Sequence, residues 1–183
     1  QYSLNPVMTV GFQIAEAYLV HANATKQEAR DRALDMLETV RIREPEKVYH
    51  LYPHEVSGGM GQRIMIAMAL ACQPKLIIAD EPTTALDVTV QAQILALLKD
   101  LTHATGAALI LITHDLGVVA RYADRVAVMY AGRIVESASA MDLYAEPRHP
   151  YTQGLMSSIP SLDGVAGAEL TTIDGQPPDL ANL

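Results

Sequence analysis

The sequence predicts an α/β fold in which a helical block precedes a parallel β-sheet. Two short apolar runs, residues 76–79 and 108–112, have the length and composition of parallel strands covered on both faces. The segment between them has apolar residues at helical spacing, and a helix is the usual crossover between parallel strands. Because half of the 183 residues are apolar, the chain can bury a core of ordinary size.

Three helices are expected in the block before the first strand. They span residues 10–21, 25–40 and 57–72, and a turn at residues 3–6 precedes the first of them. Thr25 and Glu28 have the spacing of a capping box, which places the start of the second helix. Residues 41–55 are charged and interrupted by prolines, so a loop with a short helix is expected there. Pro74 ends the third helix.

The second half of the chain continues with alternating helices and strands. The expected ranges are a helix at 87–103, a strand at 108–112, a helix at 116–121 and a hairpin at 125–136. Asp87 can cap the first of these helices, and Gly106 ends the connection to the second strand. Ala131 and Gly132 provide the turn of the hairpin. The residues after Pro160 contain several glycines and prolines and are expected to be irregular.

Composition argues against several classes of protein. A net charge of −8 without a run of Lys or Arg disfavours a nucleic-acid surface. The longest apolar stretch, residues 64–72, is much shorter than the ~20 residues that span a bilayer. Cys72 is the single cysteine, which fits a reducing compartment. No signal-peptide pattern begins at Gln1 and no Met stands there, so we expect a cytoplasmic piece of a longer protein.

A glycine-rich segment, Ser57-Gly58-Gly59-Met60, stands directly before the third helix. Glycines let a ligand approach the backbone closely, and the first N–H groups of a helix have no acceptor within it. Together with the helix dipole they form an anion site, to which the Ser57 hydroxyl adds a donor. Taken alone, the segment would more readily be interpreted as a plain glycine-rich helix cap.

Polar residues follow both expected strands. Asp80 and Glu81 come directly after the first apolar run, and Thr113, His114 and Asp115 follow the second. The carboxyl ends of parallel strands lie at one sheet edge, where ligands bind. Asp80 is therefore placed to hold Mg²⁺, and Glu81 to orient or deprotonate a water. His114 could bind a terminal phosphate, or it could be a strand-end histidine with a structural hydrogen bond.

In this order, the motifs resemble those of the ATP-binding-cassette (ABC) ATPase family. Ser57-Gly58-Gly59 is similar to its signature motif, Asp80-Glu81 to Walker B with the catalytic glutamate, and His114 to its switch histidine. The segment 85–87 resembles the D-loop. Further segments resemble the ATPase subunits of oligopeptide, dipeptide and nickel importers. They are residues 3–6, 53–55, 81–87 and 146–152, with Met60 in place of the usual Gln.

The resemblance implies an N-terminally truncated ABC-type nucleotide-binding domain, with a P-loop-NTPase-like parallel sheet and a helical signature subdomain. The partial domain would cover residues 1–159: a helical subdomain at about 11–73, an α/β core at about 74–137 and C-terminal helices at about 138–159. An irregular extension would cover residues 160–183.

The resemblance also implies ATP and Mg²⁺ as cofactors, with ATP bound between two cassettes. The residues assigned to the nucleotide are Ser57, Gly58, Gly59, Met60 and Asp87. The first four would face ATP bound by the opposite chain, and Asp87 would lie at the dimer seam. Glu81 and His114 would be catalytic, and Asp80 would be the metal ligand.

The implied function is ATP hydrolysis that drives uptake of peptides or a related small solute. The implied partners are a second cassette, transmembrane permease subunits and, indirectly, an extracytoplasmic solute-binding protein, but no nucleic acid. The chain would be peripheral on the cytoplasmic face of the inner membrane. Two alternatives stay open: a cassette of DNA repair or translation, and a non-catalytic dimerising or docking fragment.

Three features depart from the family pattern. No G-x-x-x-x-G-K-[ST] phosphate loop occurs in residues 1–183, so we expect these residues alone to be inactive as an ATPase. Gln1 stands too close to residue 3 to be assigned as the Q-loop glutamine. Gly61 replaces the Arg that is usual in this branch, and Val56 replaces Leu.

Overall fold

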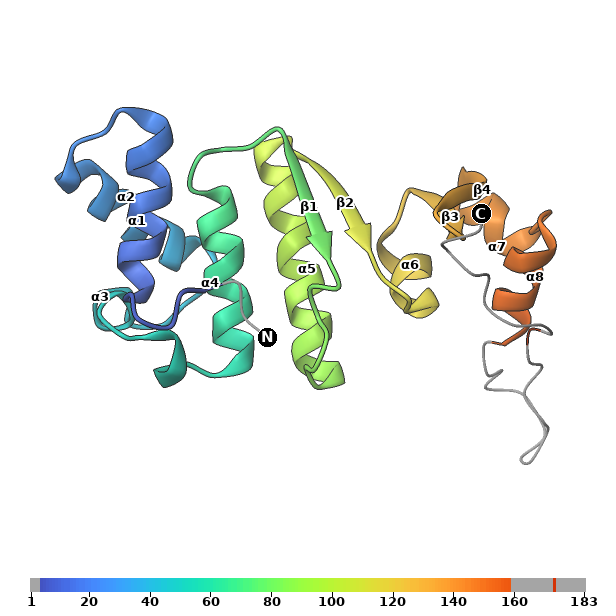
Figure 1. Cartoon of the computed structure of the whole chain (residues 1–183), viewed down its shortest axis with the longest axis horizontal. Coiled ribbons are helices and arrows are strands. Elements are labelled where there is room, and N and C mark those ends of the chain that lie inside the picture. The colour runs from blue at the N-terminus through green and yellow to red at the C-terminus, as the bar shows by residue number, and fades with distance from the viewer. Residues whose placement is uncertain (1–3, 159–172, 174–183) are drawn as a thin grey trace. The chain divides into compact units, whose positions relative to one another are not determined.

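The helices and strands follow each other in the order expected from the sequence. The computed structural model describes residues 4–158 and residue 173, and the chain divides into two units, Gln1–Ile112 and Thr113–Leu183 (Figure 1). The first unit contains α1 (Val10–Ala22), α2 (Lys26–Thr39), α3 (Pro45–Tyr49), the 3-10 turn η1 (Pro53–Glu55), α4 (Gly58–Leu70), β1 (Leu76–Asp80), α5 (Val88–Thr105) and β2 (Ala108–Ile112). The second contains α6 (Leu116–Tyr122), β3 (Arg125–Tyr130), β4 (Arg133–Ser139), α7 (Ala140–Ala145) and α8 (Pro150–Ser157).

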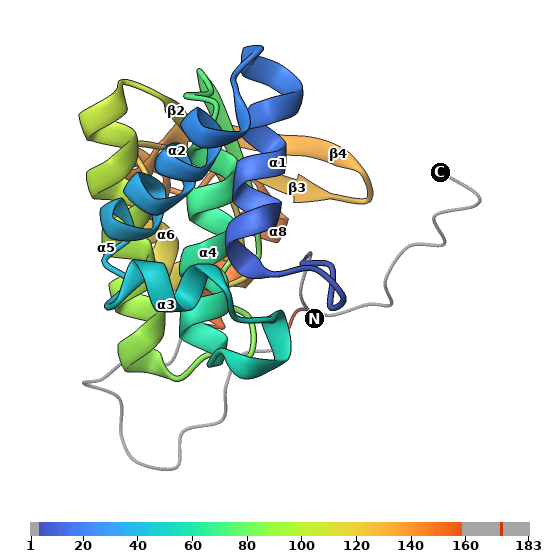
Figure 2. The same cartoon turned by 90° about the vertical axis from the view of Figure 1, so that its left-hand side faces the viewer.

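Helices α1, α2 and α4 form the helical core of the first unit, where they pack side by side (Figure 2). Each contributes a fully buried aliphatic side chain, namely Ile14, Leu37 and Ile64. The guanidinium of Arg32 on α2 also donates from Nε to the carbonyl of Ala71, at 3.0 Å, just after α4 ends. Burial of the apolar stripes and this hydrogen bond hold α4 in place against α1 and α2, and therefore determine where the N-terminus of α4 lies.

The capping box at the start of α2 is confirmed. The N–H of Glu28 donates to the Thr25 hydroxyl at 3.3 Å, and the N–H of Thr25 donates to the Glu28 carboxylate at 2.7 Å. These contacts with Thr25 lower the pKa of Glu28 below its ordinary value. The expected turn at residues 3–6 is described from Leu4 onward, and its Ser3 lies outside the described residues.

Strands β1 and β2 form a parallel pair in which Leu76 lies opposite Ala108 and Asp80 opposite Ile112. Helix α5 is the crossover between them and supplies the buried Ile94, together with further leucines, to the core. Because the strands are parallel and in register, both end at the same edge of the pair. The residues that follow β1 and β2 therefore begin at that edge.

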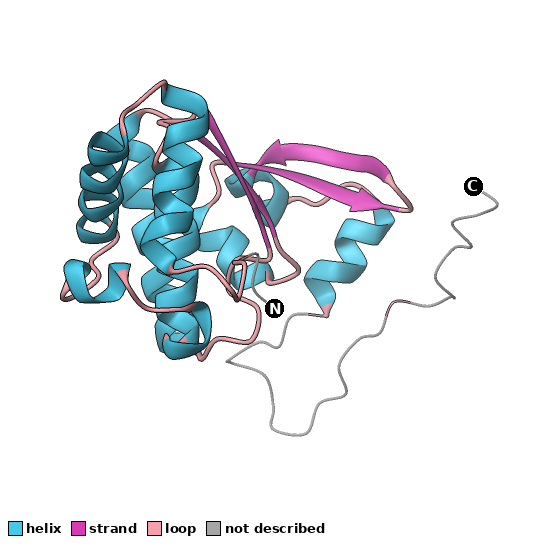
Figure 3. Cartoon of the chain, turned by 60° about the vertical axis from the view of Figure 1, so that its left-hand side comes forward, coloured by secondary structure: helices cyan, strands magenta, loops and turns pink. Residues whose placement is uncertain are grey.

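The expectation that both strands are covered on both faces is wrong for the described residues. Ile77 on the inner face is buried, whereas Ile78 and Ile110 on the outer face are 63% and 48% exposed. Figure 3 shows the helices of the first unit gathered on one side of this strand pair. The apolar run means that both faces of the strand could be buried, but the described part of the chain places helices against one face only.

In the second unit, β3 and β4 form the expected antiparallel hairpin. Tyr130 pairs with Arg133, so the connection has two residues, Ala131 and Gly132, with φ of 50° and 73°. Two left-handed residues give the turn type that suits the right-handed twist of the strands.

Helices α6 and α7 of the second unit are joined by a side-chain contact. The Tyr144 hydroxyl of α7 donates to the carbonyl of Leu116 in α6, and burial raises the pKa of Tyr144.

The domain limits expected at residues 73 and 137 stay predictions. Apart from residue 173, the expected C-terminal extension at 160–183 lies outside the described residues. Within the described ranges, none of the helices is both long and apolar enough to cross a bilayer.

Candidate functional site

The glycine-rich segment forms the N-terminus of α4, as expected. Ser57 is the N-cap residue, and its hydroxyl accepts from the N–H of Met60 at 3.4 Å. The first intrahelical bond runs from the N–H of Gly61 to the carbonyl of Ser57 at 2.8 Å. The N–H groups of Gly58 and Gly59 precede this bond and have no acceptor within the helix. A helix start of this kind, without an acidic residue in its first turn, favours an anion.

Asp80 and Glu81 lie where β1 ends, and the backbone changes conformation between them. Asp80 is the last residue of β1, and Glu81 has a φ of 43°, in the left-handed region. The N–H of Glu81 donates to the carbonyl of Ile112 at 2.9 Å, which continues the contact with β2. A non-glycine residue in this region costs about 1–3 kcal/mol and is concentrated at functional sites. Glu81 is therefore held in a strained turn at the strand edge, and its side chain is exposed.

Thr84 orients the Glu81 side chain, a contact that the sequence analysis did not identify. Its hydroxyl donates to Glu81 Oε2 at 2.9 Å, and its N–H donates to the carbonyl of Glu81 at 3.2 Å. Thr84 thus holds both ends of the residue that we assigned as catalytic. The available signal was a hydroxyl residue three positions after the glutamate in a non-helical turn.

Asp87 caps α5, as expected, and its Oδ1 accepts from the N–H of Val90 at 2.9 Å. The start of α5 lies against the start of α4, because an added Cβ on Gly59 would lie 2.8 Å from Val90 Cγ1. In Figure 1 both helices begin at the lower end of the first unit, the end toward which the arrows of β1 and β2 point. Two helix N-termini and two strand ends therefore meet at one end of this unit.

His114 is the second residue of the second unit and lies two positions after β2 ends. Its side chain is exposed. The neighbouring Thr113 hydroxyl accepts from the N–H of Asp115 at 3.0 Å, and the Asp115 carboxylate caps α6 by accepting from Val118 at 3.1 Å. The local turn around His114 is thus well defined. Its expected position beside Glu81 stays a prediction.

Asp80 suits a magnesium ion that is bound mainly through phosphates and water. Mg²⁺ in nucleotide sites uses one or two carboxylates, keeps several waters and does not need a closed protein cage. Asp80 is exposed and lies at the strand edge. In the part of the chain that the structure describes, no cluster of three or more His, Cys, Asp or Glu residues could hold a metal. An ion at Asp80 would therefore depend on the nucleotide for its remaining ligands.

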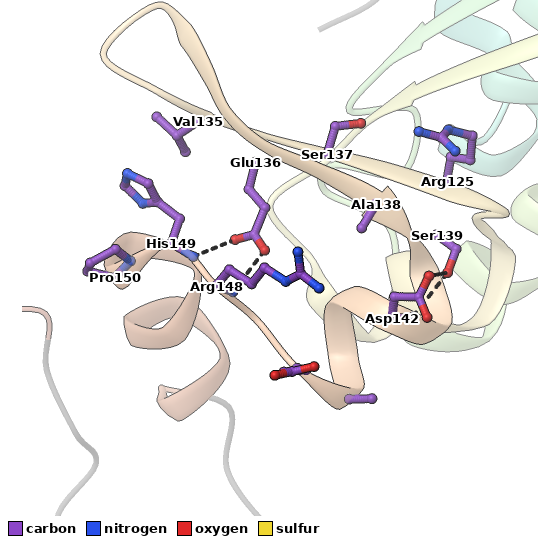
Figure 4. A pocket seen from close by; sticks show the side chains of 12 residues that line it. Arg125, Val135, Glu136, Ser137, Ala138, Ser139, Asp142, Arg148, His149 and Pro150 are labelled. Carbon is purple, nitrogen blue, oxygen red and sulfur yellow. Dashed lines mark hydrogen bonds between the residues drawn. The ribbon is translucent and has the colours of Figure 1, made fainter.

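The second unit contains a cavity of about 790 Å³ (Figure 4). One wall carries Glu136 of β4, whose carboxylate accepts from the N–H groups of Arg148 at 2.9 Å and His149 at 3.0 Å. His149 is in turn the N-cap of α8, since its Nδ1 accepts from the N–H of Tyr151 at 3.1 Å. Glu136 thus fastens the start of α8 to β4.

The pKa of Glu136 lies below its ordinary value. The nearby Thr152 hydroxyl lowers it most, and the N–H groups of Arg148 and His149 lower it further. The Oγ1 of Thr152 is fully buried and makes no hydrogen bond of normal geometry. We therefore attribute the fastening of α8 to the two backbone contacts.

We expect this fastening to weaken in acid. Because the pKa of Glu136 is lowered on folding, its stabilising contribution is present above the ordinary glutamate value of 4.5 and is lost as the pH falls below it. The protection of the Arg148 and His149 amides, measured as the exchange rate relative to the intrinsic rate at each pH, should fall over that range. Glu136→Ala, which removes both accepting oxygens, should show low protection of both amides at neutral pH and little further change in acid. Strong protection of both amides in that variant, independent of pH, would contradict the assignment of Glu136 as their acceptor.

Two family models match the chain. Residues 2–84 match the family described as ABC transporter, and residues 135–183 match the C-terminal region of oligopeptide/dipeptide transporters. The first match contains Ser57, Asp80 and Glu81. The second begins in β4, next to Glu136.

Curated relatives resemble nearly the whole chain. It is 58% identical to the oligopeptide transport ATP-binding protein OppD of Bacillus subtilis (strain 168), over 98% of this chain and 50% of that protein. It is also 58% identical to the dipeptide transport ATP-binding protein DppD of the same organism, over 97% of this chain and 53% of the relative. For OppD of Salmonella typhimurium the identity is 55%, over 99% of this chain and 54% of that protein. The chain therefore spans about half the length of the curated relatives it matches.

A solved structure shares the fold. It is an ATP-binding cassette in a dimeric, post-hydrolysis state bound to ADP and Pi, 32% identical, with a TM-score of 0.65 over 76% of this chain and 60% of that chain. The helical block and the mixed parallel and antiparallel strands are those of an ABC nucleotide-binding domain. The chain therefore carries part of an ABC transporter domain, matched at residues 2–84, and the C-terminal region of oligopeptide/dipeptide transporters, matched at residues 135–183.

Proposed function

We propose that the complete protein is the ATP-hydrolysing subunit of an ABC importer that takes up peptides or a related small solute. One observation carries the proposal: the glycine-rich start of α4 and the strained Glu81 turn lie at the same end of one unit, in a chain that carries part of an ABC transporter domain. The first feature suits a phosphate anion, and the second places a carboxylate where a water could be deprotonated.

Glu81 is proposed as the general base. Its carboxylate takes a proton from the attacking water at Oε1 or Oε2, while the Thr84 hydroxyl keeps the group oriented at 2.9 Å. Asp80 would hold Mg²⁺, which neutralises charge on the phosphates of bound ATP. His114 would donate a hydrogen bond to the terminal phosphate. Phosphoryl transfer depends mainly on positioning and charge stabilisation, which are the contributions that these side chains can make.

The glycine-rich segment is proposed to act on the opposite cassette. Residues 57–60 would face ATP bound by a partner chain: Gly58 and Gly59 would present their N–H groups, Ser57 would donate from its hydroxyl, and Met60, whose N–H donates to the Ser57 hydroxyl, would hold that hydroxyl in place. Asp87 would lie at the seam between the two cassettes. The relative solved as a dimer supports a two-cassette arrangement.

Transport rather than DNA repair or translation is favoured by the relatives, which are named as oligopeptide and dipeptide transport ATP-binding proteins. We propose that transmembrane permease subunits are the direct partners, that a solute-binding protein acts through them, and that the protein lies on the cytoplasmic face of the membrane. The exposed outer face of β1 and β2 would be covered by the rest of the cassette.

The proposal is tested with the complete protein and its membrane subunits reconstituted in vesicles. ATP hydrolysis and accumulation of a labelled di- or oligopeptide should both depend on the presence of this subunit. Hydrolysis without peptide accumulation would contradict the transport assignment. The absence of hydrolysis in an assembled complex would contradict the enzymatic one.

A further inference from the structure

The start of α4 touches the start of α5 through one close contact. A methyl group on Gly59 would lie 2.8 Å from Val90 Cγ1, closer than two carbon atoms can approach without displacement. Val90 is part-buried and packs against the core. A valine in a helix is also restricted to essentially one side-chain rotamer. Val90 therefore cannot turn aside, and any side chain at residue 59 must push the two helices apart.

The backbone of Val90 is also held in place, by a hydrogen bond to the turn before α5. Its N–H donates to Asp87 Oδ1 at 2.9 Å, so the same residue contacts the capping aspartate through its backbone and Gly59 through its side chain. One helical turn further along, Arg63 Nη2 donates to Gln93 Oε1 at 3.3 Å. This second contact joins the same two helices and limits how far they can slide.

From this geometry we propose that Val90 is a positioning residue that sets the distance between the glycine-rich start of α4 and the Asp87 turn of the same chain. Gly59 is then required because its missing side chain lets Val90 approach, in addition to any contact with a phosphate. The inference rests on the proposed ATPase function, because the group being positioned is the segment from Ser57 to Met60.

The proposal predicts an unusual rescue. In the complete protein with its membrane subunits, Gly59→Ala should lower kcat by about 10²-fold, since a displacement near 1 Å at a catalytic segment can have that effect. Val90→Ala alone should lower kcat by a smaller factor, about five- to tenfold, because the shorter side chain loosens the spacing while the contact between Arg63 and Gln93 still joins the two helices. The double variant Gly59→Ala/Val90→Ala should recover to within about fivefold of the unsubstituted protein, because the obstructing Cγ1 is gone.

Val88→Ala provides the matched control. Val88 is on the same helix, two residues away, and is 82% exposed. Gly59→Ala/Val88→Ala should therefore stay as impaired as Gly59→Ala. The KM for ATP should change little in every variant, because the substitutions are proposed to leave the contacts of ATP with its own chain untouched.

Each outcome decides the question. Full activity of Gly59→Ala would overturn the proposal, because the added methyl group would then disturb nothing that matters for turnover. A folded but inactive Gly59→Ala/Val90→Ala would also overturn it and would assign Gly59 to the ligand alone. If Gly59→Ala does not fold, the double variant should regain both its unfolding transition and its activity, and failure of either would overturn it. Lack of hydrolysis by the unsubstituted complex would instead count against the proposed function.

Discussion

Glu81→Gln in the complete protein should slow ATP hydrolysis by about 10²–10⁴-fold, the usual contribution of a general base. Glutamine keeps the size of the side chain, and its carbonyl oxygen can still accept the hydrogen bond that Thr84 donates to Glu81 Oε2. It cannot accept a proton from water. Nucleotide affinity should therefore stay close to normal while turnover is lost, which single-turnover hydrolysis and equilibrium ATP binding would measure together.

Thr84→Val is the matched test of orientation. Valine has nearly the same shape as threonine but removes the hydroxyl that donates to Glu81 at 2.9 Å. A smaller loss of turnover, about tenfold, is expected, with no change in ATP affinity.

The result for Glu81→Gln decides whether Glu81 acts in the mechanism. Near-normal turnover of Glu81→Gln would remove Glu81 from the mechanism. Loss of ATP binding in that variant would indicate a structural role instead.

Ser57→Arg should abolish ATP-driven closure of the dimer and lower hydrolysis by at least 10²–10³-fold, the range found when a preorganised donor is lost. The long side chain fills the space in front of the first turn of α4 and removes the hydroxyl that accepts from Met60. ATP binding by the same chain should survive, because Ser57 is proposed to contact the nucleotide of the opposite cassette and not that of its own chain.

Ser57→Ala separates the two effects of that substitution. It removes the cap, which is worth about 1 kcal/mol of stability, but leaves the space open. A modest loss of hydrolysis is expected from it. If Ser57→Ala and Ser57→Arg were equally inactive, the hydroxyl, as cap or as donor to ATP, would matter rather than the space in front of the helix.

Local features of this fold could be predicted from the sequence. Thr25 with Glu28, Asp87 and Ser57 were each placed correctly as helix caps, since capping depends on residues three positions apart. The hairpin turn at Ala131 and Gly132 was predicted for the same reason. Such features are decided within a few residues of chain, where spacing and residue type are sufficient.

Features that depend on contacts distant in sequence were not predicted. The left-handed backbone of Glu81 is stabilised by pairing with Ile112, 31 residues later, and the closeness of Gly59 to Val90 depends on how α4 and α5 pack. Ile78 was predicted to be buried but is exposed. An apolar run indicates that a strand can be buried, but it does not indicate which elements of the chain cover the strand.

The central claim is that Glu81 serves ATP bound by its own chain, whereas Ser57 serves ATP bound by the partner. Mixed dimers of the complete protein test it with the two substitutions Glu81→Gln and Ser57→Arg. When both are on one chain, each of the two sites contains one lesion, and hydrolysis should be lost. When each chain carries one of them, both lesions fall in the same site, and the other site should keep about half of the activity. Equal activity of the two arrangements would contradict the claim.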